Sequence, residues 1–263
     1  MNTNLDKLKR KFNNKEFFYG SSIVLNEPTI MELMCEAGFE FMWIEMEHST
    51  IDKNMVQMLT IAAKGTGTPV FVRVAENNPA IVKPILELGV AGIIFPFIKT
   101  AKEAELAVKS CKYPPEGIRG FGPKRAMRYG LMDKFEYIKN ADSNTWVMLM
   151  IEHIDAVNNL DEILKVPGIG SLVIGPHDLS GSIGILGEVE DERVIELVNI
   201  TIKKAKTANM PVGVSIPYNL ENTKKWIERD VDFIELSGDL NFLTYSSANC
   251  VNDVKKLLKS SDK

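Results

Sequence analysis

Short apolar runs alternate with longer amphipathic segments along almost the whole chain, and this alternation limits the possible folds more than any other feature of the sequence. Most of the runs are continuously apolar, as in strands that are buried on both faces of a parallel sheet. The alternation gives about eight strand–helix units. We expect strands at residues 18–25, 39–47, 69–75, 90–98, 145–152, 170–175, 211–217 and 231–238.

Eight such units in 263 residues favour a closed (β/α)8 barrel, because one barrel of this kind has about 250 residues. The alternative is an open doubly wound sheet. The sequence argues against it because no expected strand is followed by a GxGxxG phosphate-binding turn. No linker or low-complexity tract interrupts the alternation, so we expect a single barrel domain over residues 1–263.

Local signals mark where several of the helices should begin. Pro28 is expected in the first turn of the helix after the first strand, and Asn78 with Pro79 should open the helix after the third. Ser49 or Thr50 is expected to cap the helix after the second strand, because a hydroxyl side chain can accept a hydrogen bond from a free backbone N–H.

Two stretches break the regular pattern. Residues 113–130, YPPEGIRGFGPKRAMRYG, are so rich in proline and glycine that they cannot form one regular element. Residues 176–188, PHDLSGSIGILGE, are expected to form a loop between the sixth strand and the next helix.

Composition narrows the function and the location. The chain has 31 basic and 35 acidic side chains, a net charge of −4, so a nucleic-acid or anionic-membrane partner is not expected. No apolar run approaches the roughly 20 residues that span a bilayer, and the first 20 residues are polar, so we expect a cytoplasmic protein. Cys35, Cys111 and Cys250 are odd in number and far apart, which predicts three reduced, packed thiols.

Chemically capable side chains gather where the expected strands end. The active site of a barrel lies at the carboxyl ends of its strands, so these side chains should meet at one opening. Each has an ordinary alternative: an arginine can be ion-paired at the surface, and an acid can cap a helix. Their shared position is what indicates a functional site. The residues are Glu45, Glu47, His48, Arg73, Glu152, His177 and Asp178.

This set of side chains suits one type of chemistry. Two carboxylates from separate strands, with coordination positions left open, suit a hard divalent cation such as Mg²⁺ or Mn²⁺. Arg73 could hold an oxyanion in the same opening, and a histidine could move a proton. Together these groups match proton abstraction beside a carbonyl, with the resulting enolate held electrostatically.

The chain resembles the metal-dependent pyruvate aldolases of the HpcH/HpaI group, which are relatives of the citrate-lyase β-subunit. The resemblance runs from about residue 18 to about residue 240. It rests on EHST at 47–50, FVRV at 71–74, the stretch 113–130, IEHIDAVNNLDEIL at 151–164 and VIGPHDLSGSIG at 173–184.

The resemblance implies a (β/α)8 barrel of the phosphoenolpyruvate/pyruvate type and a lyase that cleaves a 4-hydroxy-2-oxo acid reversibly to pyruvate and an aldehyde. It implies Mg²⁺, Mn²⁺ or Co²⁺ as the cofactor. It also implies a homotrimer or homohexamer with active sites near the subunit contacts. The aldehyde is not implied, because loops and neighbouring subunits build its pocket.

The same resemblance implies roles for individual residues. Glu152 and Asp178 match the metal-binding carboxylates, and Arg73 matches the arginine that binds the pyruvate oxygens and stabilises the enolate. The backbone at His177 and Asp178 matches the segment that holds the pyruvate carboxylate.

His48 matches the catalytic base. Glu87 matches an acid that pairs with the base from a neighbouring subunit, and Arg125 resembles an arginine associated with the distal carboxylate of the aldehyde.

This sequence departs from the family pattern near the expected site. Glu45-Met46-Glu47-His48 stands where the family commonly has Asp-Gly-Glu-His, so the surroundings formed by Glu45 and Glu47 should differ. Met150 replaces a common glutamine and can donate no amide hydrogen bond.

Other functions remain open at this point. One is an acyl-CoA lyase or thioesterase of the citrate-lyase β-subunit type, although no basic run suggests a surface for the CoA phosphates. Another is a catalytically weak binding protein on the same fold. A Schiff-base mechanism is a further possibility, but no lysine ends an expected strand.

Overall fold

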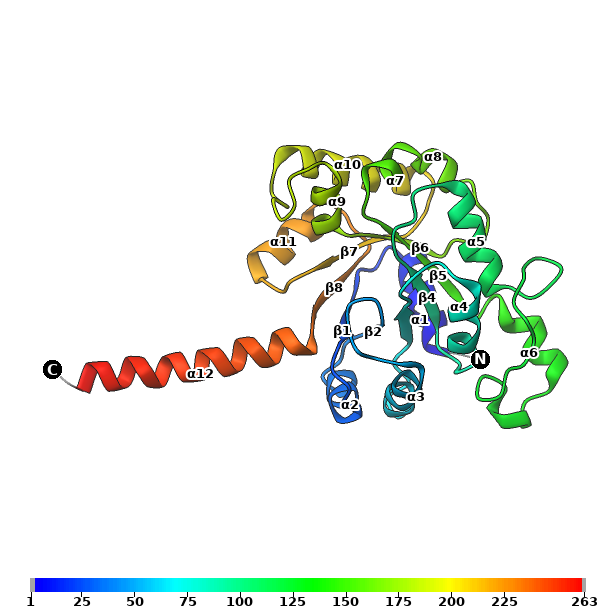
Figure 1. Ribbon diagram of the computed structural model, residues 1–263, viewed down its shortest axis with the longest axis horizontal. Coiled ribbons are helices and arrows are strands. Elements are labelled where there is room, and N and C mark those ends of the chain that lie inside the picture. The colour runs from blue at the N-terminus through cyan, green and yellow to red at the C-terminus, as the bar shows by residue number, and fades with distance from the viewer. Residues whose placement is uncertain (1–2, 262–263) are drawn as a thin grey trace.

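Eight parallel strands close into a barrel in sequence order, in a computed structural model that describes residues 3–261 (Figure 1). Each strand pairs with the next, and β1 pairs with β8 to close the ring. The predicted (β/α)8 fold is therefore confirmed. The strands are β1 Phe18–Ile23, β2 Phe41–Glu45, β3 Val70–Arg73, β4 Gly92–Phe95, β5 Trp146–Ile151, β6 Ser171–Ile174, β7 Val212–Ile216 and β8 Phe233–Gly238.

Helices surround most of the barrel and bury their apolar sides against the outward faces of the strands. The α-helices of the described residues are α1 Thr3–Asn13, α2 Pro28–Glu36, α3 Lys53–Ala62, α4 Pro79–Leu86, α5 Ala101–Cys111, α6 Lys134–Ala141, α7 Ile154–Asn158, α8 Leu160–Ile163, α9 Pro176–Ser182, α10 Glu192–Thr207, α11 Leu220–Glu228 and α12 Asp239–Ser261.

The predicted helix starts are partly correct. Pro28 begins α2, and the Asn78 side chain accepts a hydrogen bond from Ala80 N at the start of α4. The predicted cap of α3 is wrong, because Asp52 fills that role by accepting from Met55 N. Ser49 Oγ instead accepts from Ile51 N at 3.1 Å, two residues before α3 begins, and donates to the carbonyl of Glu45.

Two further differences concern elements that the sequence pattern did not predict. The expected loop 176–188 contains α9, which begins at Pro176. The polar N-terminal segment contains α1. The stretch 113–130 is irregular, as expected, and ends in a single 3-10 turn at Arg128–Gly130.

A layer of aromatic rings fills the amino end of the barrel. The Phe18 and Phe233 rings stack with centroids 5.0 Å apart, and the Phe41 ring meets both of them edge-on. Leu5 and Leu8 of α1 are fully buried in the same cluster. Helix α1 therefore closes this end, and the opening lies at the carboxyl ends of the strands.

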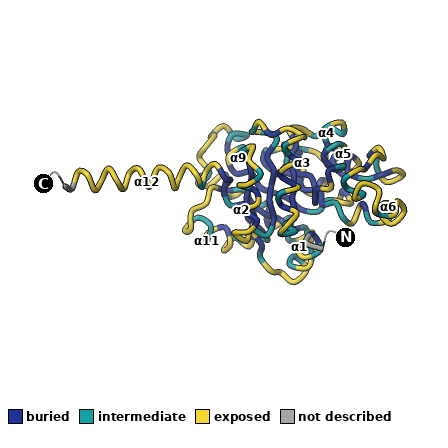
Figure 2. The backbone as a smooth tube through the Cα atoms, turned by 90° about the horizontal axis from the view of Figure 1, so that it is seen from below, coloured by how far each residue is buried: buried dark blue, intermediate teal, exposed yellow. Residues whose placement is uncertain are grey.

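The last helix leaves the barrel instead of packing on it. Helix α12 extends away from the body of the protein (Figure 1), and all its residues from 243 to 259 are exposed (Figure 2). An aromatic contact anchors the first turn of α12, where the Phe242 ring lies against Phe39 with ring centroids 6.1 Å apart.

The position of α12 also corrects the prediction for the cysteines. Cys35 and Cys111 are buried free thiols, but Cys250 lies on α12 and is exposed, so the prediction of a packed thiol is wrong there. None of the helices within residues 3–261 is long and apolar enough to cross a membrane.

Candidate active site

Polar side chains line the open, carboxyl end of the barrel, starting from two neighbouring strand ends. Glu45 ends β2 and Arg73 ends β3, and the two residues are directly paired in the strand register. Both were expected at this position because the apolar runs of their strands stop there.

The Glu45 carboxylate is buried and accepts four hydrogen bonds. Its Oε1 accepts from the backbone N–H groups of Glu47 at 2.6 Å and His48 at 3.0 Å. Its Oε2 accepts from Trp43 Nε1 at 3.2 Å and Arg73 Nε at 2.6 Å. One carboxylate thus fixes both the turn after β2 and the side chain of Arg73.

The Arg73 guanidinium is held on one side only. Its Cζ lies 5.1 Å from the centre of the Trp43 ring, and its Nε faces Glu45. Within the described part of the chain neither terminal nitrogen of Arg73 has a hydrogen-bond partner. Both remain available to an oxyanion in the opening.

Glu47 lies beside Arg73 and His48, but its Oε2 accepts a hydrogen bond from neither of them. Its Oε2 is 3.2 Å from Arg73 Nε and 3.6 Å from His48 Nε2, yet the single Nε hydrogen of Arg73 points to Glu45. Burial raises the pKa of Glu47, and the attraction of Arg73 and His48 offsets this only in part. The His48 side chain is 61% exposed and so reaches the solvent side of the opening.

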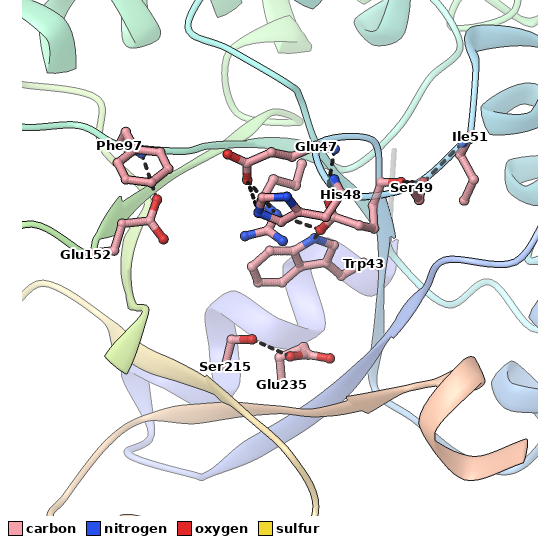
Figure 3. A network of polar contacts seen from close by, with 11 residues as sticks. Trp43, Glu47, His48, Ser49, Ile51, Phe97, Glu152, Ser215 and Glu235 are labelled. Atoms are coloured by element: carbon pink, nitrogen blue, oxygen red, sulfur yellow. Dashed lines mark hydrogen bonds and ion pairs between the residues drawn. The ribbon is translucent and has the colours of Figure 1, made fainter. Parts of the chain in front are cut away.

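Glu152 follows β5 and lies across the opening from Glu47 and His48 (Figure 3). It is 2% exposed, and its Oε1 accepts a hydrogen bond from Phe97 N at 2.7 Å. Burial raises the pKa of Glu152 to about 7, and the nearby negative charge of Asp178 acts in the same direction.

A glycine makes room for this buried carboxylate. A Cβ atom at Gly175 would lie 2.7 Å from Glu152 Oε2 and 3.3 Å from Met150 Cε. Glu152 therefore packs against the start of α9, where Asp178 lies in the first turn. Asp178 raises the pKa of both Glu47 and Glu152, as expected for a charge that shares their opening.

The donor set fits a divalent cation. Glu45, Glu47, Glu152 and Asp178 bring four carboxyl groups to an opening in which Arg73 is the paired cation. Across residues 3–261 no group of three or more His, Cys, Asp or Glu side chains could hold a metal by itself. A cation held by only two protein carboxylates would leave coordination positions for water or substrate oxygens.

Two of the predicted residues lie at the opposite end of the barrel. The Arg125 guanidinium donates to the carbonyl groups of Leu88 and Thr60, and Ala126 N donates to Glu87 O at 3.1 Å. These contacts place Glu87 and Arg125 where α3 and α4 end, beside a cavity of about 840 Å³. Neither residue reaches the opening of its own chain.

His177 lies at the start of α9, is exposed, and has its carbonyl bonded by Ser180 Oγ at 2.6 Å. Trp43, which contacts Glu45 and Arg73, was not predicted from the sequence, although it lies two residues before Glu45 and so shares its face of the strand.

Glu235 on β8 was also missed, although a carboxylate inside an apolar strand is a visible signal. It is fully buried, accepts from Ser215 Oγ at 2.6 Å (Figure 3), and burial raises its pKa to about 7.

The closed barrel and its acidic opening define an enzyme of the (β/α)8 class with its site at the carboxyl ends of the strands. The family model described as HpcH/HpaI aldolase/citrate lyase matches residues 20–244, and the chain belongs to this family.

Individual relatives agree with this assignment. The 5-keto-4-deoxy-D-glucarate aldolase of Escherichia coli (strain K12) is 29% identical over 252 residues, which cover 95% of this chain and 97% of the relative. The crystal structure of an HpcH/HpaI aldolase from Desulfitobacterium hafniense DCB-2 has a TM-score of 0.89 and 28% identity, covering 94% of this chain and 96% of that one. A family member from Burkholderia cenocepacia J2315 also has a TM-score of 0.89, with 26% identity and coverage of 95% and 99%.

These findings confirm the enzyme class expected from the sequence. The protein is a carbon–carbon lyase of the aldolase type, in a family that generally depends on a divalent metal.

Proposed function

We propose that this aldolase cleaves a 4-hydroxy-2-oxo acid reversibly to pyruvate and an aldehyde. The observation that carries the proposal is Arg73, whose Nε is held by Glu45 at an opening rich in carboxylates and whose terminal nitrogens have no hydrogen-bond partner among residues 3–261. This arrangement suits a substrate with adjacent oxo and carboxylate oxygens, because such a substrate can bridge a cation and a guanidinium.

Glu152 and Asp178 are the residues that we propose as metal ligands, for Mg²⁺, Mn²⁺ or Co²⁺. The cation would supply Lewis acidity at the 2-oxo group. The near absence of solvent around Glu152 supports this role, since a buried carboxylate with a raised pKa is stabilised by a nearby positive charge.

We assign proton transfer and the stabilisation of the enolate to side chains of the protein. His48 would take the proton of the 4-hydroxyl, the bond between C3 and C4 would break, and its electron pair would remain on the pyruvate fragment as an enolate. Arg73 would hold the enolate oxygen. His48 would then return a proton to C3, and the backbone at His177 and Asp178 would hold the pyruvate carboxylate.

Glu45 and Glu47 would act indirectly. Glu45 orients Arg73 and the turn that carries His48, and Glu47 lies 3.6 Å from the His48 ring. Met150 packs under Gly175 and leaves this side of Glu152 without an amide donor, so metal affinity should depend more on Glu152 and Asp178 alone.

Glu87 and Arg125 could act only in the opening of a second copy, because they lie at the far end of their own barrel. We therefore propose a homo-oligomer, a trimer or a hexamer, in which this end meets a neighbouring opening. We also propose a cytoplasmic location, since the three free cysteines suit a reducing compartment.

The first substrate to test is the one named for the Escherichia coli relative, 5-keto-4-deoxy-D-glucarate. A diacid of this kind would carry the distal carboxylate for which Arg125 is proposed.

The primary experiment is deuterium exchange at C3 of pyruvate, followed by proton NMR with and without added Mn²⁺. We expect exchange that EDTA abolishes and that added Mn²⁺ restores. A folded enzyme that exchanges no pyruvate under any metal would instead support the binding protein. Cleavage of acyl-CoA thioesters without pyruvate exchange would support the citrate-lyase alternative.

A further inference from the structure

Three polar side chains face the interior of the barrel on the side formed by β1, β7 and β8. Glu235 follows Phe233 of the aromatic layer by two residues and so shares its inward face, and Ser215 is the partner of Glu235 in the strand register. Ser22 is paired in register with Trp43, whose side chain belongs to the same inner cluster. We call Ser22, Ser215 and Glu235 the polar cluster.

The Glu235 carboxyl group contacts the serines but keeps one oxygen unpaired. Its Oε2 accepts from Ser215 Oγ at 2.6 Å (Figure 3). Burial raises the pKa of Glu235, and the hydroxyl groups of Ser215 and Ser22 and the charge of Arg73 oppose this, so all three lie close to the carboxyl group. Its Oε1 is buried and has no hydrogen-bond partner in the described part of the chain. Because an unpaired buried polar atom is unfavourable, Oε1 is a suitable partner for a ligand.

The two serines connect this buried carboxyl group with the active-site opening. Along β7 every residue except Ser215 is buried, and Ser22 is also partly exposed although it faces inward. The rings of Phe18 and Phe233 fill the amino end of the barrel, so solvent reaches these serines from the carboxyl end. Ser22 and Ser215 are thus the accessible part of the polar cluster, and Glu235 is its buried part.

The polar cluster lies on the side of the opening that the proposed reaction leaves free. The groups proposed for the cation and pyruvate are Arg73 at the end of β3, Glu152 after β5 and Asp178 after β6. Strands β7, β8 and β1 complete the ring of strands. The aldehyde half of the substrate, which is joined to C3 of pyruvate, therefore has this side available.

A hydroxyl group is the ligand that suits the unpaired oxygen of Glu235 best. An ionised carboxylate accepts hydrogen bonds, and a protonated carboxyl group can also donate one. A hydroxyl group both donates and accepts, so it matches either form. A methyl group would leave Oε1 unpaired, and a second carboxylate would be repelled by the ionised form.

We propose that Glu235, together with Ser22 and Ser215, binds a hydroxyl group on the aldehyde half of the substrate and so selects hydroxylated aldehydes over their deoxy analogues. This inference rests on the proposed aldolase reaction and names residues that determine its specificity. A site that hydrogen-bonds a substrate hydroxyl rejects the analogue without it, because that analogue leaves a buried group unpaired.

The test measures the aldol addition of pyruvate to matched aldehydes in the presence of Mn²⁺. The pairs are glycolaldehyde with acetaldehyde and 3-hydroxypropanal with propanal, and each pair differs by one hydroxyl group. The measured quantity is the ratio of kcat/KM within a pair. Partial loss of fold or of metal affects both aldehydes equally, and comparison between proteins removes the intrinsic reactivity of the aldehydes.

The variants remove the polar cluster one group at a time. Glu235→Met, which has a similar length but no carboxyl group, should lower the ratio about 10- to 100-fold in the pair whose hydroxyl reaches the cluster. Glu235→Gln keeps an acceptor and a donor, so it should keep most of the preference, and Ser215→Ala should lower the ratio by a smaller factor. The control Ser171→Ala removes another inward serine, which is fully buried and accepts from Trp146 Nε1 at 3.0 Å, and it should keep the wild-type ratio.

Two results would overturn the proposal. Wild-type ratios for both pairs in Glu235→Met and Ser215→Ala would mean that substrate does not bind Oε1, and an equal fall in Ser171→Ala would mean that any change inside the barrel has the same effect. Deuterium exchange at C3 of pyruvate is measured without aldehyde and so tests the reaction separately. Exchange without a hydroxyl preference would refute the polar cluster alone, whereas absence of exchange would refute the proposed reaction and the polar cluster with it.

Discussion

Arg73 Nε donates to Glu45 Oε2 at 2.6 Å, and these two residues are the paired ends of neighbouring strands. The guanidinium is therefore positioned by the barrel itself, before any substrate enters. Groups that are fixed in advance stabilise a developing charge without the cost of reorganisation.

Replacing Glu45 with Gln should slow pyruvate exchange about 10²-fold, because a small misplacement of a reacting group can cost that much. The amide nitrogen of glutamine accepts no hydrogen bond, so either Trp43 Nε1 and Arg73 Nε or the backbone N–H groups of Glu47 and His48 would lose their acceptor. Either loss would displace a group of the site. The control is Glu40→Gln, at the other end of β2, where Glu40 pairs with Lys11. Equal rates in wild type and Glu45→Gln would show that Glu45 does not position Arg73.

Replacing Arg73 with Lys should lower the exchange rate by about 10²–10³-fold, as expected when a transition-state contact is lost. Lysine keeps the charge but lacks the planar fork that can bind two oxygens at once. Single-turnover NMR with saturating Mn²⁺ separates this effect from weaker binding. An unchanged turnover number would count against any role in holding the enolate.

Glu152→Gln and Asp178→Asn should each greatly weaken Mn²⁺ binding in calorimetry, with little change in the circular dichroism spectrum. In wild type the affinity should rise with pH through about 7 and then level off, because Glu152 must lose its proton to bind the cation. Wild-type affinity in both variants would require other ligands.

His48→Ala should abolish proton exchange while leaving Mn²⁺ and pyruvate binding nearly intact, since the proposed ligands and Arg73 are unchanged. The matched control is His153→Ala. The His153 ring only caps α7 by accepting from Asp155 N at 3.1 Å. Exchange at the wild-type rate in His48→Ala would show that His48 is a structural residue.

Because of Glu235, the free energy of unfolding should fall as the pH rises from about 4.5 to about 7. Its pKa is about 7 in the folded protein against 4.5 as the ordinary value, so folding favours the protonated form. Above pH 7 the contribution of Glu235 to the free energy of unfolding should be about 3 kcal/mol lower than below pH 4.5. Urea titrations of Glu235→Gln should lack this component, whereas the control Glu228→Gln, on the surface of α11, should retain it.

A glutamine variant as pH-sensitive as wild type would mean that the fold does not favour the protonated form of Glu235. The unpaired Oε1 atom of this residue argues that it does, since a buried carboxylate would need a partner there.

The strands and the opening could be predicted from the sequence because both depend on local pattern. A continuous apolar run predicts a buried strand, and a charged residue at its end predicts a side chain at the opening, as for Glu45, Arg73 and Glu152. Helix α9 could not be predicted this way. Its glycine and serine residues disfavour a helix, but burial of Leu179 and the bond from Ser180 Oγ to His177 O stabilise it.

Other features depend on how distant segments meet. Glu87 and Arg125 lie at the far end because helices run opposite to the strands in a barrel, so residues that end a helix are carried away from the opening. The course of α12 depends on the missing connection after Gly238, a spacing that no hydrophobic pattern reveals.

The aromatic layer and α1 close the amino end of the barrel, so substrates and products pass through the opening at the carboxyl end. Both products of the proposed cleavage must leave through the opening at the carboxyl ends of the strands. The pyruvate fragment would be held near the buried Glu152, whereas the aldehyde would form beside the more exposed His48. The aldehyde should therefore depart first and pyruvate last. In the direction of synthesis, the enzyme would have to load pyruvate before its partner, and the order of binding would follow from the shape of the barrel.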